Sequence, residues 1–498
     1  MVSSVVVIGA GLAGLSTACY LTGRGYEVTV VDREDVPGGR NGLLRRDGFT
    51  FDTGPTVLTM PDLIAAALRA VGSDLSAVGP LKRLDPAYRA RYADGSTILV
   101  RHGREAMRQE IADTCGSVDA AAFEGFVEWL RKLYLVEMPN YIDVNYDSPL
   151  GLVRNPLAAA SLLRLGAFRR LGTAVRSFFR DPRLVKLFSF QAMYAGLAPE
   201  KALALYAVIT YMDSIEGVYF PEAGMHAVPV AMAAAAEKAG ATFRYGESVE
   251  AVLRSPTGRV AGVRLAGGEA IRADAVVCTL DTPIAYEQLL PDLVPPRAAR
   301  PGRGEYSPSA VVWHVGVRGV PATDGDDPVA HHNIHFGEQW DASFEALLER
   351  GSLMPDPSRL VTLHSLDGAG LAPAGCSTLY VLEPVPNLAT GRIDWLAEAP
   401  RMRDRLHRFL GENGYPDDVV TEELVDPVEW QRQGMAAGTP FALAHTFAQT
   451  GPFRPPNREQ RVPGLFFAGS GTVPGVGVPM VLISGKLAAA RVAAYLPA

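Results

Sequence analysis

Residues 5–14 of this chain read VVVIGAGLAG, and this short stretch determines the fold that we expect. Its first four residues are apolar and β-branched, as a strand buried inside a parallel sheet requires. A helical segment follows up to about Gly23, and a second strand is predicted at Glu27–Val31, directly before Asp32. The order of strand, glycine-rich turn, helix, strand and acid predicts a Rossmann-like βαβ unit.

Each glycine in this G-x-G-x-x-G pattern has a physical reason to be there. Gly9 permits the tight turn after the strand, and Gly11 allows a pyrophosphate to approach the backbone at the start of the helix. Gly14 allows the helix to pack closely on the strand, and Asp32 is placed to accept hydrogen bonds from a ribose. The pattern therefore indicates a dinucleotide site; the alternative is a glycine-rich turn without a ligand.

Length and composition set limits on the organisation and on the partners. A chain of 498 residues exceeds what one hydrophobic core supports, so we expect at least two cores. With 48% hydrophobic and 20% charged residues, the chain is globular. Its 47 basic and 54 acidic residues give a net charge of −7, which argues against a nucleic-acid partner.

Cysteines and long uncharged stretches indicate the compartment. The four cysteines form no C-x-x-C pair, which favours isolated thiols in a reducing environment. The uncharged stretches 2–23 and 462–485 are interrupted by glycines, and the second also by prolines. Such backbone cannot satisfy its own hydrogen bonds in lipid, so we expect neither a membrane-spanning helix nor secretion.

Further along, Gly38-Gly39-Arg40 follows Asp32 at a spacing that extends the dinucleotide motif. Here the chain resembles the flavoproteins with two dinucleotide-binding motifs, a group that includes amine oxidases and carotenoid desaturases. The resemblance implies FAD, with the GGR segment near its pyrophosphate.

More specific segments narrow the resemblance and extend it from end to end. The segments are FTFDTGPT (49–56), GVYFP (217–221), GCSTLYVLEPVPNL (375–388), FRPPNR (453–458) and GLFFAGSGTVPGVGVP (464–479). Together they resemble bacterial-type phytoene desaturases and related carotenoid oxidoreductases.

This resemblance implies a mixed α/β architecture of the amine-oxidase and GDI type, in which a Rossmann-like FAD-binding domain carries an inserted substrate-binding domain. We expect 1–79, 221–284 and 456–498 to form the FAD domain, and 80–220 and 285–455 to form the substrate-binding, membrane-contacting domain. The expected FAD-binding residues are Gly9, Ala10, Gly11, Leu12, Ala13, Gly14, Asp32, Arg33, Gly38, Gly39, Arg40, Gly54, Pro55, Thr56, Val249, Gly469 and Ser470.

The implied function is FAD-dependent desaturation of phytoene, in steps toward lycopene, with a quinone or oxygen as electron acceptor. Three positions depart from the family pattern: Glu222, the pair Ala444-His445, and Val473. These departures leave open another carotenoid desaturase or a flavin-dependent carotenoid isomerase. A non-enzymatic prenyl-lipid carrier of the GDI-like fold is a more distant alternative, which the intact phosphate-binding motif disfavours.

No residue stands out from the sequence as the catalytic base. His445 and Asp143 are weak candidates, and Glu137 and Asp147 have residue types that can stabilise positive charge in a substrate. For each of them a structural or solvated role is the competing interpretation.

Two further patterns bear on partners. His331, His332 and His335, near Asp324, Asp326 and Asp327, have the residue types of a metal site, but the ligand motif is incomplete and we expect no metal. The stretch 156–170 alternates apolar residues with arginines, as a helix lying on a membrane surface does. We therefore expect a cytoplasmic protein attached peripherally to the membrane.

For local structure, a helix is predicted over 223–239, and 241–253 and 259–272 are predicted to form short antiparallel strands.

Overall fold

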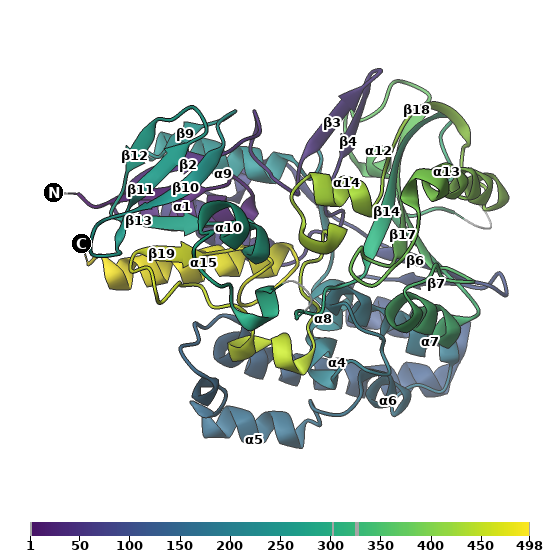
Figure 1. Cartoon of the computed structure of the whole chain (residues 1–498). Coiled ribbons are helices and arrows are strands. Elements are labelled where there is room, and N and C mark those ends of the chain that lie inside the picture. Colours follow the sequence, from purple (N-terminus) through teal and green to yellow (C-terminus); the bar gives the residue numbers. More distant parts are fainter. Residues whose placement is uncertain (1, 301–302, 324–327, 498) are drawn as a thin grey trace.

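The computed structural model describes residues 2–300, 303–323 and 328–497. Its N-terminal motif forms the centre of a five-stranded parallel sheet with the strand order β19-β13-β1-β2-β9 (Figure 1). These strands are β1 (Ser4–Ile8), β2 (Glu27–Val31), β9 (Thr242–Arg244), β13 (Ala275–Cys278) and β19 (Leu465–Phe467). The sheet is therefore assembled from three distant parts of the chain.

Helices cover one face of this sheet and an antiparallel sheet lies beside it. The helices are α1 (Leu12–Thr22), α2 (Pro61–Ala70), α9 (Ala227–Lys238) and α15 (Val478–Tyr495). Another helix, α10 (Thr282–Leu289), follows β13 in the chain. The antiparallel sheet consists of β10 (Val249–Arg254), β11 (Val260–Leu265) and β12 (Ala270–Arg272). Val5, Val7, Val28 and Val30 are buried against α1, so the apolar run of the sequence becomes the core of this region.

Helix α15 packs directly on α1. The Ser16 hydroxyl donates to the carbonyl of Leu482 (2.7 Å), and a Cβ on Gly485 would lie 2.3 Å from the carbonyl oxygen of Ala13. Among the described residues, α15 is the one helix long and apolar enough to cross a membrane, but 56% of its 18 residues are buried inside the molecule. This burial is typical of a core helix.

A second, seven-stranded sheet stands beside the first (Figure 1), with the order β18-β14-β17-β16-β15-β6-β7. Its strands are β6 (Tyr88–Tyr92), β7 (Thr97–Val100), β14 (Ser309–Arg318), β15 (His332–Phe336), β16 (Arg359–Thr362), β17 (Cys376–Val385) and β18 (Asp418–Val425). The helices α11 (Trp340–Glu345), α12 (His364–Asp367), α13 (Trp395–Glu412) and α14 (Pro427–Arg432) accompany it. Two ribbons, β3 (Leu43–Arg46) with β4 (Phe49–Asp52) and β5 (Leu81–Arg83) with β8 (Tyr219–Pro221), connect the two regions.

A helical layer lies below both sheets in Figure 1. It comprises α3 (Arg104–Cys115), α4 (Ser117–Glu137), α5 (Pro156–Arg164), α6 (Leu171–Arg176), α7 (Pro182–Leu187) and α8 (Ala207–Thr210). The aromatic rings of Phe123, Phe126, Phe179 and Phe188 pack against one another and form its core. Side chains of this layer and of the seven-stranded sheet together line a large cavity.

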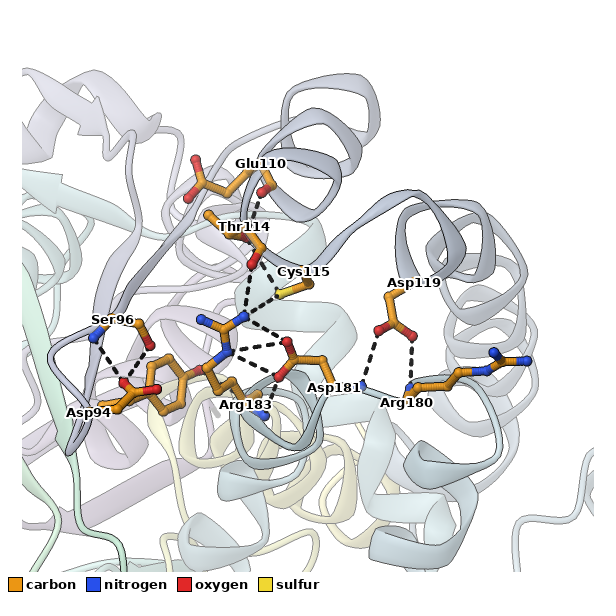
Figure 2. Close-up of polar contacts among 10 residues, drawn as sticks. Asp94, Ser96, Glu110, Thr114, Cys115, Asp119, Arg180, Asp181 and Arg183 are labelled. Atoms are coloured by element: carbon orange, nitrogen blue, oxygen red, sulfur yellow. Dashed lines mark hydrogen bonds and ion pairs between the residues drawn. The ribbon is translucent and has the colours of Figure 1, made fainter.

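Buried polar groups fix the turns of the helical layer (Figure 2). The Asp119 carboxylate accepts hydrogen bonds from the backbone N–H groups of Arg180 (2.7 Å) and Asp181 (3.1 Å). The Arg183 guanidinium contacts the Asp181 carboxylate (2.7 Å) and donates to the carbonyl of Thr114 (2.8 Å). These contacts tie the start of α7 to α3 and α4.

Two predicted elements differ from the observed ones. The helix predicted over 223–239 begins later, at Ala227, because the Asp52 carboxylate accepts from the backbone N–H groups of Met225 and His226 and holds them outside the helix. The stretch 241–253 is not one antiparallel strand: Thr242–Arg244 pairs in parallel with β2, and the antiparallel part begins at Val249.

Candidate functional site

Two of the three glycines in the glycine-rich turn, Gly9 and Gly14, have no room for a side chain. A Cβ on Gly9 would lie 2.2 Å from the Thr279 hydroxyl oxygen, and one on Gly14 would lie 1.9 Å from the carbonyl oxygen of Gly9. Gly11 is the N-cap of α1 and, lacking a side chain, leaves the first N–H groups of the helix uncapped. This is a cradle of backbone donors that suits a phosphate.

Asp32 lies at the end of β2 and is held by backbone donors. Its carboxylate accepts from the N–H of Ala10 (2.5 Å) and of Glu34 (2.9 Å), so it is fixed beside the glycine-rich turn. Burial raises the pKa of Asp32, while these two hydrogen bonds act in the opposite direction. A carboxylate has about four lone-pair sites, so Asp32 keeps acceptor capacity for a ribose diol.

The GGR segment lies against the glycine-rich turn. The N–H of Gly38 donates to the carbonyl of Ala10 (2.9 Å), and a Cβ on Gly39 would lie 3.1 Å from the Cα of Gly11. The Arg40 guanidinium then forms an ion pair with Asp281 (2.7 Å) and a hydrogen bond with the Ser470 hydroxyl. A cation is thus held next to the cradle, where it can neutralise a bound pyrophosphate.

The segment 52–56 lies between the GGR segment and the large cavity. A Cβ on Gly54 would lie 1.8 Å from the carbonyl oxygen of Arg40, so this loop passes tightly over the GGR segment. Pro55 and Thr56 follow it and line the large cavity. These contacts bring the predicted residues 9–14, 38–40 and 54–56 into one continuous region.

A buried arginine holds the two C-terminal loops together. Arg454 is only 2% exposed, and its guanidinium donates to the carbonyls of Ser470 (2.6 Å), Thr472 (3.1 Å), Leu443 (3.2 Å) and Gln449 (3.3 Å). Burial lowers the pKa of Arg454 to about 10, so the group stays charged at neutral pH. The sequence motif that contains Arg454 was identified without a role for it; the role is only visible once the loops are placed.

Three other predicted cofactor residues have partners outside residues 9–14. The Gly469 N–H donates to the Ser484 hydroxyl oxygen (3.0 Å), which ties the end of strand β19 to α15. Val249 is half-buried at the start of β10, opposite Leu265. Arg33 is turned elsewhere: its guanidinium pairs with Glu34 (3.0 Å) and donates to the carbonyl of Gln433 (2.6 Å).

A large cavity adjoins the glycine-rich region and enters the helical layer. Its volume is about 620 Å³. Its wall consists mainly of apolar and aromatic side chains from the helical layer and from the seven-stranded sheet. Pro55, Thr56 and residues 474 and 476–480 belong to the same wall, and Pro55 directly follows Gly54, which packs on Arg40 of the GGR segment. Such a cavity suits a long apolar ligand that binds mainly by burial of its surface.

His445 lies in the wall of this cavity. A Cβ on Gly475 would lie 2.1 Å from the His445 Cε1 atom, so the ring packs directly on the backbone there. The Tyr206 hydroxyl donates to the backbone carbonyl of His445. Burial, helped by the positive charge of Arg454, holds the pKa of His445 well below its usual range, so the imidazole is neutral.

The candidate carboxylates are separated by the fold. Asp143 forms an ion pair with Lys486, and Asp147 forms ion pairs with Arg458 (3.3 Å) and Arg491 (2.7 Å); neither is part of the cavity wall. Glu137, by contrast, lies in the wall and is 4% exposed. Asp143 therefore has a structural partner where the sequence allowed a catalytic role.

Asp213, which the sequence did not single out, is also a wall residue. The Ser214 hydroxyl donates to its carboxyl group (2.5 Å), and burial raises the pKa of Asp213 to about 7.

The histidines at the start of β15 are buried, and each has its own hydrogen-bond partner, although the rings of His331 and His332 lie 4.6 Å apart. His331 pairs with Asp367 (2.9 Å), His332 lies between the carbonyls of Thr56 (3.1 Å) and Ala87 (3.2 Å), and His335 contacts the Tyr415 hydroxyl (2.8 Å). Within the described ranges, no three His, Cys, Asp or Glu side chains gather as metal ligands would. The acids Asp324, Asp326 and Asp327 lie outside the described residues.

The chain belongs to the family of flavin-containing amine oxidoreductases, whose family model matches residues 12–493. The cradle, Asp32 and Arg40 fit FAD in the chemistry of their donors and acceptors, and the FAD prediction is confirmed by the family.

Within this family, the chain resembles bacterial phytoene desaturases over almost its whole length. It is 49% identical to the phytoene dehydrogenase of Streptomyces griseus, over 99% of this chain and 95% of that protein. It is 36% identical to the zeta-carotene-forming phytoene desaturase of Myxococcus xanthus, over 98% of this chain and 93% of that protein. The predicted resemblance to phytoene desaturase-type carotenoid oxidoreductases is confirmed.

Solved structures confirm the predicted architecture. Cyclohexylamine oxidase from Brevibacterium oxydans matches with a TM-score of 0.60 and 17% identity over 99% of both chains. Rab GDI from Plasmodium falciparum matches with a TM-score of 0.55 and 11% identity over 98% of this chain and 97% of that one. The fold is thus the amine-oxidase and GDI fold.

Proposed function

We propose that this chain is an FAD-dependent desaturase that removes hydrogens stepwise from phytoene toward lycopene. The observation that carries the proposal is the apolar cavity of about 620 Å³, which runs from the helical layer to the glycine-rich region. A polyene hydrocarbon offers no polar group for recognition, so its binding free energy comes from burial, at about 25 cal/mol per Å² of apolar surface.

When FAD is bound, it supplies the two-electron acceptor for the hydrogen that leaves the substrate. The protein's own contribution is to hold FAD and to keep the polyene in place. In our proposal the backbone donors of residues 9–14 and Arg40 hold the pyrophosphate, and Asp32 holds the ribose. Pro55, Thr56 and residues 476–480 then exclude water at the end of the cavity where the cofactor region begins.

Each new double bond requires the loss of one hydride, which the bound cofactor accepts, and of one proton from the neighbouring carbon. This proton requires an acceptor near the substrate. His445 is a neutral imidazole in the cavity wall, and we assign it the task of taking this proton. Its pKa is low for a base, but an allylic cation is a strong acid, so a weak base is sufficient. The Arg454 charge fixes the loop that carries His445 and keeps its ring neutral before the reaction.

Exposed apolar residues at the cavity wall support a membrane-docked enzyme. Five of them are both exposed and part of the wall, and two more lie beside them in the sequence, one before α5 and one on it. This apolar rim consists of Leu150, Val153, Leu157, Leu163, Phe168, Phe447 and Phe453. The exposed Arg154 and Arg164 accompany it in the sequence and suit anionic headgroups. We propose that the rim enters the bilayer surface, so that the lipid-soluble substrate passes directly into the cavity.

Liposome flotation tests the rim. Leu157 is 81% exposed, and Leu157→Glu removes an apolar anchor worth about 2 kcal/mol, so membrane binding weakens about 30-fold. The matched control is Leu396→Glu, because Leu396 is 91% exposed but lies on α13, away from α5 (Figure 1). Equal effects of the two substitutions would contradict membrane docking through the rim.

We further propose a cytoplasmic location, which the four free cysteines support. A quinone dissolved in the same membrane, or oxygen, accepts the electrons from the reduced cofactor.

Product analysis tests the desaturase itself. The purified protein is supplied anaerobically with FAD, phytoene in liposomes and a quinone, and the pigments are separated. We expect coloured products whose absorption reports the number of new conjugated double bonds. Unchanged phytoene, from protein shown to hold FAD, would contradict this substrate and favour a later carotenoid or an isomerisation.

A further inference from the structure

Two polar side chains interrupt the apolar wall of the cavity where the long helix α4 ends. Glu137 is the last residue of α4, and Tyr141 follows within the short helical turn Met138–Ile142. Both side chains line the cavity. Neither the Glu137 Oε1 atom nor the Tyr141 hydroxyl has a hydrogen-bond partner among the described residues.

Two other acids of this region, Asp143 and Asp213, each have a partner at one carboxyl oxygen. Asp143 pairs with Lys486 through Oδ2, and the Ser214 hydroxyl donates to Asp213 Oδ1 at 2.5 Å. Asp143 Oδ1, like Glu137 Oε1, has no partner among the described residues, but Asp143 is not part of the cavity wall. Glu137 has neither a cation nor a hydroxyl at its Oε1 atom, although its side chain is 4% exposed. Leaving a buried polar group without a hydrogen bond is unfavourable. An arrangement with this cost is explained if a ligand completes it.

Burial also determines what kind of ligand fits. Desolvation raises the pKa of Glu137 well above its ordinary value, which favours the neutral carboxylic acid. A neutral carboxylic acid and a phenol both carry an O–H donor. Together they suit an oxygen atom that accepts hydrogen bonds, whereas a hydrocarbon has no such atom.

We propose that Glu137 and Tyr141 form a polar subsite that binds the carbonyl or hydroxyl oxygen of a long apolar ligand inside the cavity. This inference rests on the proposed function only in taking the cavity as the place where lipid-soluble molecules bind. Two kinds of molecule share the required chemistry: a polyene that carries an oxygen at its end, and a quinone with an apolar tail. Apolar pockets with one or two placed polar groups orient their ligands in this way.

Ligand binding to the FAD-loaded enzyme tests the subsite, with three probes titrated against flavin fluorescence. The probes are all-trans-retinal for the oxygen-bearing polyene, decyl-1,4-benzoquinone for the quinone, and phytoene for the hydrocarbon. In Glu137→Met we expect the Kd of at least one oxygen-bearing probe to rise about tenfold, which corresponds to one lost hydrogen bond of about 1.4 kcal/mol. The Kd of phytoene should stay within about twofold, because its contacts are apolar.

Further variants separate a hydrogen-bonding role from a structural one. Glu137→Gln keeps an N–H donor of similar size, so it should retain most of the affinity. Tyr141→Phe removes the second donor with little change of shape and carries the test if the methionine variant fails to fold. Glu128→Gln, on the exposed side of the same helix, is the matched control.

The pattern over the probes decides the outcome. Loss for retinal alone identifies an oxygen-bearing polyene, and loss for the quinone alone identifies the electron acceptor. Equal weakening of all three probes, or unchanged binding of both oxygen-bearing probes in Glu137→Met and Tyr141→Phe, would overturn the proposal. Failure of the wild-type enzyme to bind or convert purified phytoene would instead count against the proposed function, whatever the two oxygen-bearing probes do.

Discussion

Replacing Gly14 by alanine tests whether the tight contact between α1 and the glycine-rich turn is required for the cofactor. The added Cβ would lie 1.9 Å from the carbonyl oxygen of Gly9 and 3.3 Å from a methyl group of Val7. Ordinary contacts begin at 3.4 Å, so the helix and the turn must separate by about 1.5 Å. Overpacking of this kind costs about 2 kcal/mol of folding free energy. The same displacement moves the N–H donors away from the pyrophosphate, and one charge-assisted hydrogen bond lost raises the Kd for FAD by at least about tenfold.

The assay measures the free energy of unfolding of the protein without cofactor, by urea titration, and the Kd for FAD, by fluorescence. The matched control is Gly267→Ala, because a Cβ on Gly267 meets nothing within 4 Å and its φ is not in the left-handed region. We expect this control to equal the wild type. A Gly14→Ala protein with wild-type stability and wild-type FAD affinity would refute the argument from close packing.

Two further predictions concern the buried ionisable residues Arg454 and Asp213. Arg454→Met removes the donor of four backbone carbonyls, so we expect the free energy of unfolding, measured by urea titration, to fall by about 3–5 kcal/mol. Arg454→Lys should lose less. Equal stability of the wild type and both variants would contradict this prediction. Asp213→Asn should flatten the pH dependence of stability. Because folding raises the pKa of Asp213 from 3.8 to about 7, its contribution is complete below about pH 4 and is lost as the pH rises through about 7. The wild type should therefore lose stability relative to Asp213→Asn over this range in thermal unfolding, and parallel pH profiles would argue against a neutral Asp213.

The parts of the fold that depend on local patterns were predictable. Strand Glu27–Val31 was predicted with the bounds that the structure has, because its β-branched residues stand between the break at Gly25 and Asp32. The start of α9 was not predictable, since it is set by Asp52, a residue far away in the sequence. Likewise, nothing local distinguishes Thr242–Arg244 as a parallel edge strand beside β2.

The candidate site divides in the same way. The glycines and Asp32 have roles that follow from spacing, so the sequence could identify them. Glu137 and Asp143 are six positions apart and equivalent in residue type, and only the tertiary structure separates them: one lies in the cavity wall and the other is paired with Lys486. Arg454 was part of a recognised motif, but its four carbonyl partners come from loops that no local pattern connects.

The three-part origin of the parallel sheet has a consequence for the order of events during synthesis. Strand β19 and helix α15 are made long after β1 and α1, yet they complete the edge of the sheet and the layer against α1. The helical layer, with the rim residues between 150 and 168, is made well before β19 and α15. Because domains fold as units once their parts are present, the layer against α1 is completed only after α15 has been made. This part of the rim is thus available to chaperones or to the membrane before the cofactor can be held.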